Sequence, residues 1–444
     1  MHVIPQLRDL EARFSDQLVV IGVHSAKYTT EGRDVHLEDA VQRLGLHHPV
    51  VNDSGMRVWS EYAVRAWPTL MFIGPDGRVI GKHEGEFDPE QMGAAVAQMI
   101  AEASEAGDLR PGHFELEAPP RPLPEPLAYP AAVQVGNGHL YIADTAHHRI
   151  VIANLDGRIV RSIGGVEPGF RDGMANDAAF NSPHGLALDG DRLYVADTGN
   201  HAIRMIDLNT TEVTTLAGTG RLALSYGSGG AARETDLRSP WDVALVDGTL
   251  FIAMAGNHQL WMHRLGSNEV RRFAGTGHEG KRDDRVPRAW LAQPSGIVPM
   301  GDELLFADAE TSSVRVSATT TDGDVTTLVG KDLFDWGDVD GPLDSALLQH
   351  VTGVAYEPES GLIYVADTYN NKLKRIDLEQ RVIVTLAGTG DPALSDGPAE
   401  YAAFFEPHGL TTHDGQLYVA DTNNHAIRSV DLNSGTVSTL DIRE

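Results

Sequence analysis

A short motif that recurs along most of the chain sets the strongest limit on its fold. In its full form the motif reads Leu-Tyr-Val-Ala-Asp-Thr, as at residues 193–198. Full, close and degenerate copies stand in chain order at 140–145, 193–198, 250–254, 305–308, 363–368 and 417–422. The fixed position in successive copies recurs every 53 to 59 residues. A period of this kind is typical of proteins built from repeated supersecondary units.

Two further elements repeat with the same period and complete the unit. A Pro-x-Gly-type segment precedes the motif, as in Pro183-His-Gly-Leu, and a Val-Thr-Thr-Leu-Ala-Gly-Thr-Gly segment follows it at 213–220. Each unit therefore holds four short strands separated by turn residues. Four-stranded units repeated around an axis make a β-propeller, so the six units predict an all-β, six-bladed propeller over 130–444.

The first quarter of the chain has a different pattern, in which helices and strands alternate. Its periodicity predicts helices at 4–14, 35–45 and 88–103 and strands at 18–24, 49–51, 69–73 and 78–82. The strand at 18–24 is a continuous apolar run, which predicts burial, and Asp88 is expected to cap the last helix. A Pro-rich stretch follows. We therefore divide the chain into an α/β domain at 1–106, a linker at 107–129 and a propeller at 130–444.

The composition argues against several classes of partner and chemistry. The chain carries 35 Lys and Arg against 63 Asp and Glu, a formal charge of −28, which argues against binding to nucleic acid or to an anionic membrane surface. It contains no cysteine, so these residues supply no disulfide, thiolate metal site or dithiol redox centre. The start at Met1 lacks the features of a signal peptide, and no apolar stretch has the length of a membrane span. The expected location is the cytoplasm.

Several segments resemble a known family more closely than blade geometry requires. The repeated units resemble NHL repeats throughout 130–440. The segments that carry the closer resemblance are 21–27 (Ile-Gly-Val-His-Ser-Ala-Lys), 51–53, 67–70, 239–243, 252–256, 293–296 and 337–341. By these segments the chain is identified as a member of the NHL-repeat-containing protein 2 family. The resemblance implies a thioredoxin-like domain joined to a six-bladed NHL propeller.

The sequence departs from the family pattern at both ends. Members carry a Cys-x-x-Cys-type segment and a central strand just ahead of the stretch that matches His2-Val3, and vertebrate members carry a β-domain beyond the propeller. Without that strand, the strands expected at 18–23 and 69–73 each lose a neighbour, which leaves unpaired backbone groups and an unfilled slot. We expect such a domain to have low stability unless another segment fills the slot. Two explanations stay open: Met1 is an internal methionine of a longer natural protein, or the segment has been lost.

Residues Trp67, Pro68 and Thr69 resemble the cis-proline loop that faces the redox cysteines of thioredoxins. A cis X-Pro bond presents a backbone edge with which an extended substrate chain can pair. The alternative is an ordinary strand entry with a packed Trp67. The resemblance favours the cis loop, here as a relic, because this sequence has no cysteine for the loop to serve.

An Asp closes most copies of the repeated motif, and an Asn commonly follows three residues later. The repeated acids are Asp144, Asp197, Asp308, Asp367 and Asp421. Their recurrence in five blades favours a structural role over metal binding, because a catalytic group is needed once. We expect each carboxylate to accept backbone N–H groups in the turn between the second and third strands. Basic residues are expected to pair with acids on solvated faces between blades, at Arg204, Arg315, Lys374 and Arg428.

The variable residue of each Pro-x-Gly element is predicted to line the mouth of the central channel, because this element opens the innermost strand. In blade order these residues are Ala131, His184, Trp241, Ser295, Thr352 and His408. Long connections between blades reach the same face, and their Asp-Gly pairs at 172–173, 340–341 and 396–397 are expected to make its rim acidic. We take this face as the candidate binding surface.

His184 and His408 are weak candidates for metal ligands at that mouth. Amidating lyases, which are also six-bladed NHL propellers, place zinc-binding histidines at this kind of position. A catalytic zinc takes three protein ligands, and the other equivalent positions of this chain hold no third candidate. Solvated or hydrogen-bonded histidines are therefore the favoured interpretation, and we expect no metal and no other cofactor.

Three functions are compatible with the sequence. The favoured one is a non-catalytic interaction or scaffold protein, which binds another protein or a peptide at the loop-bearing face of the propeller and carries a redox-inactive thioredoxin-like domain. The second is a thiol–disulfide or peroxide-handling redoxin whose cysteines lie upstream of Met1. The third is a metal-dependent propeller lyase or hydrolase that uses His184 and His408.

Overall fold

The structure is a computed structural model that describes residues 3–110, 112, 122–165 and 167–444. The chain separates into two compact units, residues 1–122 and 123–444. The predicted linker at 107–129 lies across this boundary, and its residues 111 and 113–121 fall outside the described residues. No helix within the described ranges is long and apolar enough to cross a membrane.

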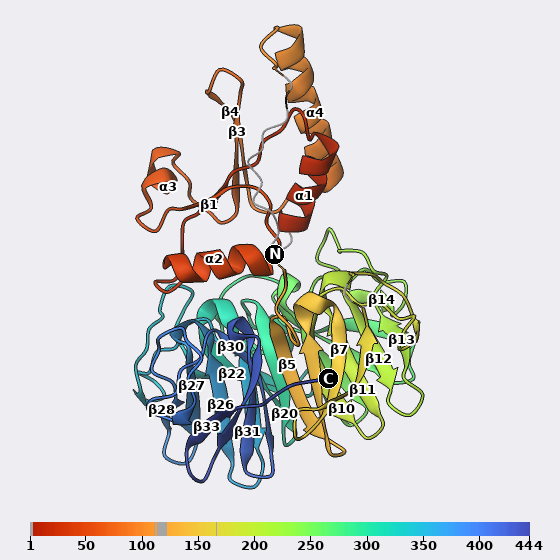
Figure 1. Ribbon diagram of the computed structural model, residues 1–444, viewed down its shortest axis with the longest axis vertical. Helices are drawn as coiled ribbons and strands as arrows, with labels where there is room; N and C mark the ends of the chain where they lie inside the picture. Colours follow the sequence, from red (N-terminus) through yellow and green to blue (C-terminus); the bar gives the residue numbers. More distant parts are fainter. Residues whose placement is uncertain (1–2, 111, 113–121, 166) are drawn as a thin grey trace. The chain divides into compact units, whose positions relative to one another are not determined.

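Six antiparallel sheets, each built on four consecutive strands, form the blades of the propeller (Figure 1), as the repeat period predicts. The first two blades contain β5 Pro130–Gly136, β6 His139–Asp144, β7 Arg149–Asn154, β8 Ile159–Gly164, β10 Pro183–Asp189, β11 Arg192–Asp197, β12 Ala202–Asp207 and β13 Glu212–Ala217. The third and fourth contain β15 Pro240–Val246, β16 Thr249–Met254, β17 Gln259–Arg264, β18 Glu269–Ala274, β20 Pro294–Met300, β21 Glu303–Asp308, β22 Ser313–Ala318 and β23 Asp324–Val329. The last two contain β25 Gly353–Glu357, β26 Leu362–Asp367, β27 Lys372–Asp377, β28 Val382–Ala387, β30 Pro407–His413, β31 Gln416–Asp421, β32 Ala426–Asp431 and β33 Thr436–Thr439.

A single 3₁₀ turn joins the second and third strands of every blade. These turns are η1 Thr145–His147, η2 Thr198–Asn200, η3 Ala255–Asn257, η5 Ala309–Thr311, η6 Thr368–Asn370 and η7 Thr422–Asn424. Because strand direction alternates within a blade, the turns lie at the same end of the propeller as the starts of the innermost strands. We call this end, formed by the 3₁₀ turns and the Pro-x-Gly elements, the mouth.

The long connections between blades run along the outer edges of the propeller as well as over its mouth. Each connection adds a short fifth strand to the outermost strand of the blade that it enters. These strands are β9 Gly173–Met174, β14 Gly229–Ala231, β19 Asp284–Arg285 (followed by η4 Val286–Arg288), β24 Gly341–Pro342 and β29 Gly397–Pro398. Because blades diverge away from the axis, the space between neighbouring blades widens outward, and residues of the connections fill it. A few residues of each connection are therefore core, while much of its length stays exposed at the surface.

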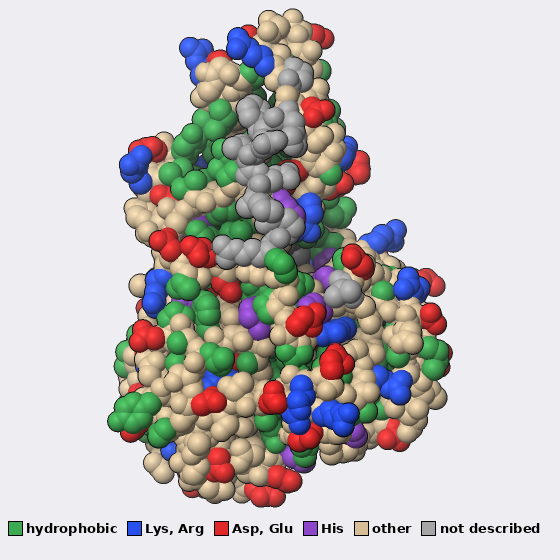
Figure 2. Space-filling view, viewed as in Figure 1, with side chains coloured by type: hydrophobic (Ala, Val, Ile, Leu, Met, Phe, Trp, Pro, Cys, Tyr) green, Lys and Arg blue, Asp and Glu red, His purple; other side chains and the backbone are tan. Residues whose placement is uncertain are grey.

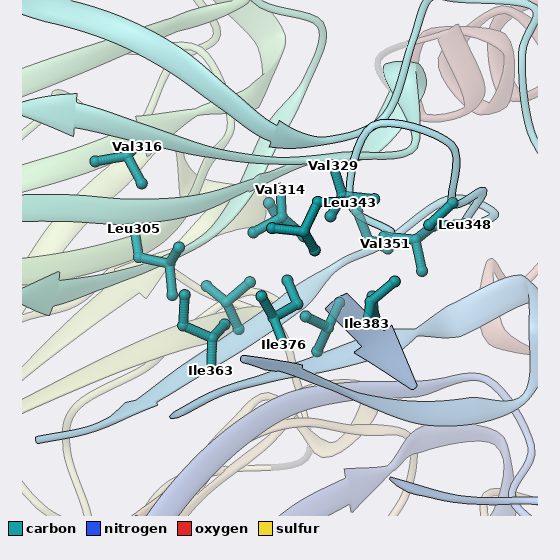
Figure 3. Close-up of a cluster of buried hydrophobic side chains, with 14 residues drawn as sticks. Leu305, Val314, Val316, Val329, Leu343, Leu348, Val351, Ile363, Ile376 and Ile383 are labelled. Atoms are coloured by element: carbon teal, nitrogen blue, oxygen red, sulfur yellow. The ribbon is translucent and has the colours of Figure 1, made fainter. Parts of the chain in front are cut away.

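The interface between the fourth and fifth blades shows how a connection fills this space (Figure 3). Leu305 and Val314 of the fourth blade pack in one cluster with Ile363 of the fifth. Leu343 and Leu348, from the connection between these blades, belong to the same cluster and are 3% and 1% exposed. Full burial of a Leu side chain contributes about 1.5–3 kcal/mol, so the connections are part of what stabilises the ring.

The end of the chain closes the ring against the first blade. Thr422 Oγ1, in the last blade, donates a hydrogen bond to the Pro130 carbonyl oxygen at 2.8 Å. The N–H of Ile159 donates to the Arg443 carbonyl at 2.7 Å, and the N–H of Arg443 donates to the Gly157 carbonyl at 3.0 Å. The tail thus pairs beside β8, at the place where the other blades hold their short fifth strand.

The N-terminal unit contains the helices and strands expected from its α/β pattern and one further short helix. They are α1 Val3–Arg13, β1 Gly22–His24, α2 Asp34–Arg43, β2 Val50–Asn52, α3 Arg57–Glu61, β3 Thr69–Ile73, β4 Val79–Glu84 and α4 Pro89–Glu105. The Asp88 carboxylate accepts the backbone N–H groups of Glu90 and Gln91 at 2.9 and 3.0 Å, so it caps α4 as predicted. Helix α3, five residues long, was not expected from the sequence.

The strands of this unit form two separate sheets. β1 pairs in parallel with β2 and β3 pairs antiparallel with β4, but no strand among the described residues joins β1 to β3. The prediction of a buried strand at 18–24 is wrong: β1 is shorter, and Val19, Ile21 and Val23, which alternate onto one side of the run, are 44–58% exposed. Figure 2 shows hydrophobic side chains gathered on the surface of this unit.

Candidate functional site at the propeller mouth

An aromatic pair stands at the entrance to the central channel. His184 of β10 and Trp241 of β15 come from neighbouring blades, and their ring centroids lie 4.4 Å apart at 48°. Both side chains are half-buried. His184 Nδ1 lies 3.0 Å from the carbonyl oxygen of Ser182, which fixes the imidazole ring beside the indole. The pair therefore presents a preformed aromatic surface at the mouth.

The other variable residues of the Pro-x-Gly elements contribute less surface. Ala131, Ser295 and Thr352 are 7%, 3% and 7% exposed. The hydroxyl groups of Ser295 and Thr352 make hydrogen bonds inside the propeller. His408 is half-buried on β30. The accessible part of the predicted set is therefore the aromatic pair and His408.

Below the mouth, the main chain of the innermost strands almost closes the channel. A cavity of about 30 Å³ remains along the axis. Glycine holds the third position of the Pro-x-Gly element at Gly185, Gly296, Gly353 and Gly409. A Cβ at any of these positions would come within 2.0 to 2.8 Å of an atom of the next blade. Glycine is required here because neighbouring innermost strands approach each other so closely around the axis.

The third blade replaces this glycine with Asp242, which lines the same cavity. Its Oδ1 accepts the N–H of Val243 at 2.8 Å, and its Oδ2 accepts the N–H of Ile297, in the fourth blade, at 2.9 Å. The backbone N–H of Leu186, in the second blade, is a third donor. Burial raises the pKa of Asp242 to about 7, and the three N–H groups oppose that rise. One carboxyl group thus connects three blades at the axis.

A ring of hydrogen bonds around the mouth joins each blade to the next. The residue after each 3₁₀ turn accepts a backbone N–H of the next blade at 2.9 to 3.2 Å. The acceptors are His148, His201, His258, Ser312, Asn371 and His425. In the histidines the acceptor is Nδ1, which must therefore be unprotonated. Burial lowers the pKa of His148 and of His425 to about 4, which keeps both rings neutral at physiological pH.

The repeated Asp residues end the second strand of five blades and are fully buried. In the second blade, Asp197 Oδ1 accepts the N–H of Asn181 at 2.8 Å, while Oδ2 accepts from Asn200 Nδ2 at 2.8 Å and Arg204 Nη1 at 2.7 Å. Burial raises the pKa of Asp197 to about 6 against the attraction of Arg204, so the carboxylate is ionised at neutral pH. Asp308, Asp367 and Asp421 likewise each accept a backbone N–H and lie within 4 Å of a cationic side chain. Asp144 pairs with His147 and Arg149.

The basic residues opposite these acids are buried, contrary to the solvated role expected for them. Arg204, Arg315, Lys374 and Arg428 are all 0% exposed. Each also binds an Asp of the connection that enters its blade, as Arg204 Nη2 binds Asp172 Oδ1 at 2.9 Å. The connection runs along the outer edge of the blade and covers the cation there, which is why no solvated face remains.

The Asp residues of the connections do not form the acidic rim that was expected. Asp172 accepts the N–H and the hydroxyl of Thr215, at 3.1 and 2.7 Å, in addition to its bond from Arg204. Although burial opposes the effect, these bonds hold the pKa of Asp172 below its usual value. Asp340 and Asp396 are held in the same way. These side chains are 36–51% exposed, but each carboxylate is paired with a buried cation that compensates its charge.

The metal interpretation gains no support from the geometry of the mouth. In the parts of the chain that the structure describes, no group of three His, Cys, Asp or Glu side chains is placed to hold a metal ion. His184 and His408 therefore have no third ligand among these residues.

The loop at Trp67–Pro68 lies in the N-terminal unit, and its peptide bond is cis. Trp67 Nε1 donates a hydrogen bond to the Ser25 carbonyl oxygen at 2.7 Å, and the Trp67 ring centroid lies 4.3 Å from that of Trp59. Thr69, which opens β3, donates through Oγ1 to the Ala66 carbonyl oxygen at 2.7 Å. The 444 residues supply no cysteine to this loop.

Sequence reasoning missed Asp242 and the ring of histidines, although a signal for each was present. Asp242 stands where four other blades have glycine. The histidines stand four residues after the repeated Asp position, at His148, His201, His258 and His425. Asp242 departs from the repeat, whereas the histidines recur within it. Both are found only when the blades are aligned and compared position by position.

Comparison with known proteins places both units in one family. The NHL repeat family matches residues 180–204 and 404–428, and a thioredoxin-like family matches residues 1–79. NHL repeat-containing protein 2 of Gallus gallus is 40% identical over 479 residues, covering 100% of this chain. The chain belongs to the NHL repeat-containing protein 2 family. It spans 66% of the length of that relative. The thioredoxin-like unit and the six-bladed propeller expected of the family are both present.

One further relative and one solved structure extend the comparison. The chain is 40% identical over 462 residues to Protein SUPPRESSOR OF QUENCHING 1, chloroplastic, from Arabidopsis thaliana, covering 99% of this chain and 44% of that protein. Among solved structures, a structural genomics protein of unknown function from Bacteroides thetaiotaomicron superposes with a TM-score of 0.50 at 18% identity, over 68% of this chain and 69% of that one. This second likeness concerns the fold alone.

Proposed function

We propose that this member of the NHL repeat-containing protein 2 family is a binding protein that holds a segment of another protein at the mouth of its propeller. The observation that carries the proposal is the half-buried pair of His184 and Trp241 at the entrance to the channel, with ring centroids 4.4 Å apart. Aromatic side chains give a large contact area with few rotatable bonds, and Trp is enriched among the residues that dominate binding energy.

The rigid frame around this pair supports the proposal. Neighbouring innermost strands approach each other closely around the axis, and the ring of hydrogen bonds at 2.9 to 3.2 Å joins every blade to the next. A site held in this way loses little conformational entropy when a partner binds, which favours affinity.

Affinity capture with the full chain tests the proposal. The bait proteins are the wild type and Trp241→Ser, because serine is the residue that the fourth blade carries at the equivalent position, Ser295. We expect at least one protein captured from an extract of the source cells to be recovered about tenfold less with the variant, a loss of ~1.4 kcal/mol. The thermal unfolding midpoint of the variant should stay within a few degrees of the wild type, as expected for a half-buried position.

Glu359→Ala is the matched control. Glu359 is exposed in the turn that follows β25, at the opposite end of the propeller from the mouth. This variant should recover the same proteins as the wild type. Equal recovery of every captured protein by Trp241→Ser and the wild type would exclude the mouth as the binding surface.

The match of residues 1–79 to a thioredoxin-like family favours a second candidate function, thiol–disulfide or peroxide chemistry. These residues contain no cysteine, so the activity requires cysteines that precede this sequence in a longer form of the protein. Disulfide reduction by a longer form with a cysteine pair ahead of His2 tests it. Activity that is lost when either cysteine is changed to serine supports this candidate, and inactivity with both cysteines present contradicts it.

A further inference from the structure

Asp242 differs from the other propeller carboxyl groups with a raised pKa in having no cationic partner among the described residues. Burial raises the pKa of five carboxyl groups there, those of Asp197, Asp242, Asp308, Asp367 and Asp421. Four of the five lie within 4 Å of a buried Arg or Lys. Asp242 has burial and three backbone N–H groups as its only influences. When it is ionised, the Asp242 carboxylate carries a charge that no cation among the described residues balances.

The hydrogen bonds of Asp242 leave room for one more donor. A carboxylate offers about four acceptor positions, and the N–H groups of Leu186, Val243 and Ile297 occupy three of them. Asp242 lines the axial cavity, so a donor that enters this cavity reaches the carboxylate. The cavity volume of about 30 Å³ is of the order of the volume of one or two water molecules, which suits an ammonium group.

The entrance to the cavity has the chemistry that favours a cation on an aliphatic stem. Trp241 and His184 line the same cavity as Asp242. The face of an indole ring attracts a cation, and the methylene groups of a long side chain pack well against aromatic rings. A lysine side chain combines a compact ammonium with such a stem, whereas the guanidinium of arginine is a broader plane that fits a narrow cavity less well.

The fifth blade shows that this protein already buries an ammonium among carboxylates. The Lys374 side chain is 1% exposed, and its Nζ lies 2.5 Å from Asp338 Oδ1 and 2.8 Å from Asp340 Oδ1. Its third short contact is with Thr385 Oγ1 at 2.9 Å. A buried ammonium is therefore compatible with this fold where carboxylate and hydroxyl oxygens surround it.

We propose that the axial cavity at the mouth binds the side-chain ammonium of a lysine presented by a partner protein, with Asp242 as its counter-charge and Trp241 against its stem. The inference rests on the proposed function and names the chemistry that the mouth recognises. The formal charge of −28 favours a basic partner, because opposite charges speed the encounter of two proteins. An inorganic cation in the same cavity is the competing occupant.

Titration of the full-length chain with matched small probes tests the proposal without any substitution. The probes are Nα-acetyl-lysine methylamide, Nα-acetyl-norleucine methylamide, which has an apolar side chain and no ammonium, and potassium chloride, at constant ionic strength and with binding followed by ligand-detected NMR. We expect saturable binding of the lysine probe, at least about tenfold tighter than that of the norleucine probe. Equal binding of the two probes overturns the proposal, as does tight binding of potassium without binding of the lysine probe.

Two variants assign the binding to Asp242. Asp242→Gly gives the third blade the residue that four other blades carry, and it should abolish binding of the lysine probe. Asp247→Asn changes an exposed acid just beyond the far end of β15 and should leave binding unchanged. Unchanged binding in a folded Asp242→Gly variant overturns the proposal, and if that variant does not fold, the comparison of lysine with norleucine on the wild type decides.

The probe titration and the partner capture together distinguish a failure of this inference from a failure of the proposed function. Loss of partner capture in Trp241→Ser without any binding of the lysine probe overturns the lysine inference and leaves the mouth as a binding surface. Binding of the lysine probe without any effect of Trp241→Ser on partner capture supports the cavity and contradicts the proposed function.

Discussion

The guanidinium group of Arg204 is fully buried, with Nη1 2.7 Å from Asp197 Oδ2 and Nη2 2.9 Å from Asp172 Oδ1. One side chain therefore ties the end of the second strand to the third strand and to the connection that enters the blade. The third blade lacks the whole arrangement, because Met254, Trp261 and Gly229 stand in the places of Asp197, Arg204 and Asp172. The loss of all three together indicates that these positions depend on one another.

Arg204→Met should destabilise the propeller by about 3–5 kcal/mol, because it leaves the buried Asp197 carboxylate without its cation. The measurement is the free energy of unfolding of the propeller in denaturant. Arg161→Ala, which removes an exposed arginine, is the control and should change this free energy by less than about 0.5 kcal/mol.

Transfer of the third blade's residues to the second blade tests whether these three positions depend on one another. Asp172→Gly, Asp197→Met and Arg204→Trp introduced together should cost less stability than Arg204→Met alone, because no charge is left buried without a partner. A combined variant less stable than the single one would contradict this dependence.

Acid should weaken the ring of hydrogen bonds around the mouth through His148 and His425. Burial lowers the pKa of each to about 4 in the folded protein, against an ordinary value of 6.5 in the unfolded chain. As the pH falls, the unfolded state binds these protons first, so the stability contributed by the neutral rings is complete above pH 6.5 and is lost as the pH falls toward 4. The titratable groups that face both rings are His147 and Asp144.

The double variant His148→Asn and His425→Asn measures this contribution. Asn371 already accepts the equivalent hydrogen bond in the fifth blade, at 2.9 Å, and asparagine does not titrate. The difference in unfolding free energy between pH 7 and pH 5 should therefore be smaller in the variant than in the wild type. The same difference in both proteins would show that these two rings do not carry the acid sensitivity.

The architecture could be predicted well from the sequence because the repeated residues make the same contacts in nearly every blade. The period of 53 to 59 residues led to six blades, and the Pro-x-Gly elements led to His184 and Trp241 as residues of the mouth, although not to the contact between their rings. The buried cations were missed because the contact of Arg204 with Asp172 joins residues 32 apart, across a connection whose path no local pattern reveals. Asp242 was missed because its position matters only when the blades are superposed around the axis.

The N-terminal unit was predicted less well, for a related reason. An apolar run such as 18–24 indicates burial only when other elements cover both of its faces. Here one side of the run is left uncovered, since Val19, Ile21 and Val23, which alternate onto it, are 44–58% exposed. An apolar sequence pattern shows that a segment would be stable when buried. Whether the segment is buried depends on the elements that pack against it.

Gly353→Ala should strain the closure of the ring. A Cβ at Gly353 would lie 2.0 Å from the carbonyl oxygen of His408, in the next blade, and main-chain atoms cannot move aside cheaply. We expect a loss of about 1–3 kcal/mol and a lower thermal midpoint, as is usual for overpacking. Gly165→Ala is the control, because a Cβ there meets no atom within 4 Å. Equal midpoints for the two variants would show that the innermost strands can separate without loss of stability.

The two sheets of the N-terminal unit should exchange their amide hydrogens faster than the propeller does. Val23 in β1 and Ile73 in β3 are 44% and 51% exposed, and each of these strands pairs along only one edge within the described residues. In the propeller, β11 is paired along both edges and Val195 is 0% exposed. Because local opening costs less where little apolar surface is buried, we expect the amides of β1 and β3 to exchange at least about a hundredfold faster than those of β11. Hydrogen–deuterium exchange on the intact chain measures both rates at once, and equal protection would mean that the open edges are covered in solution.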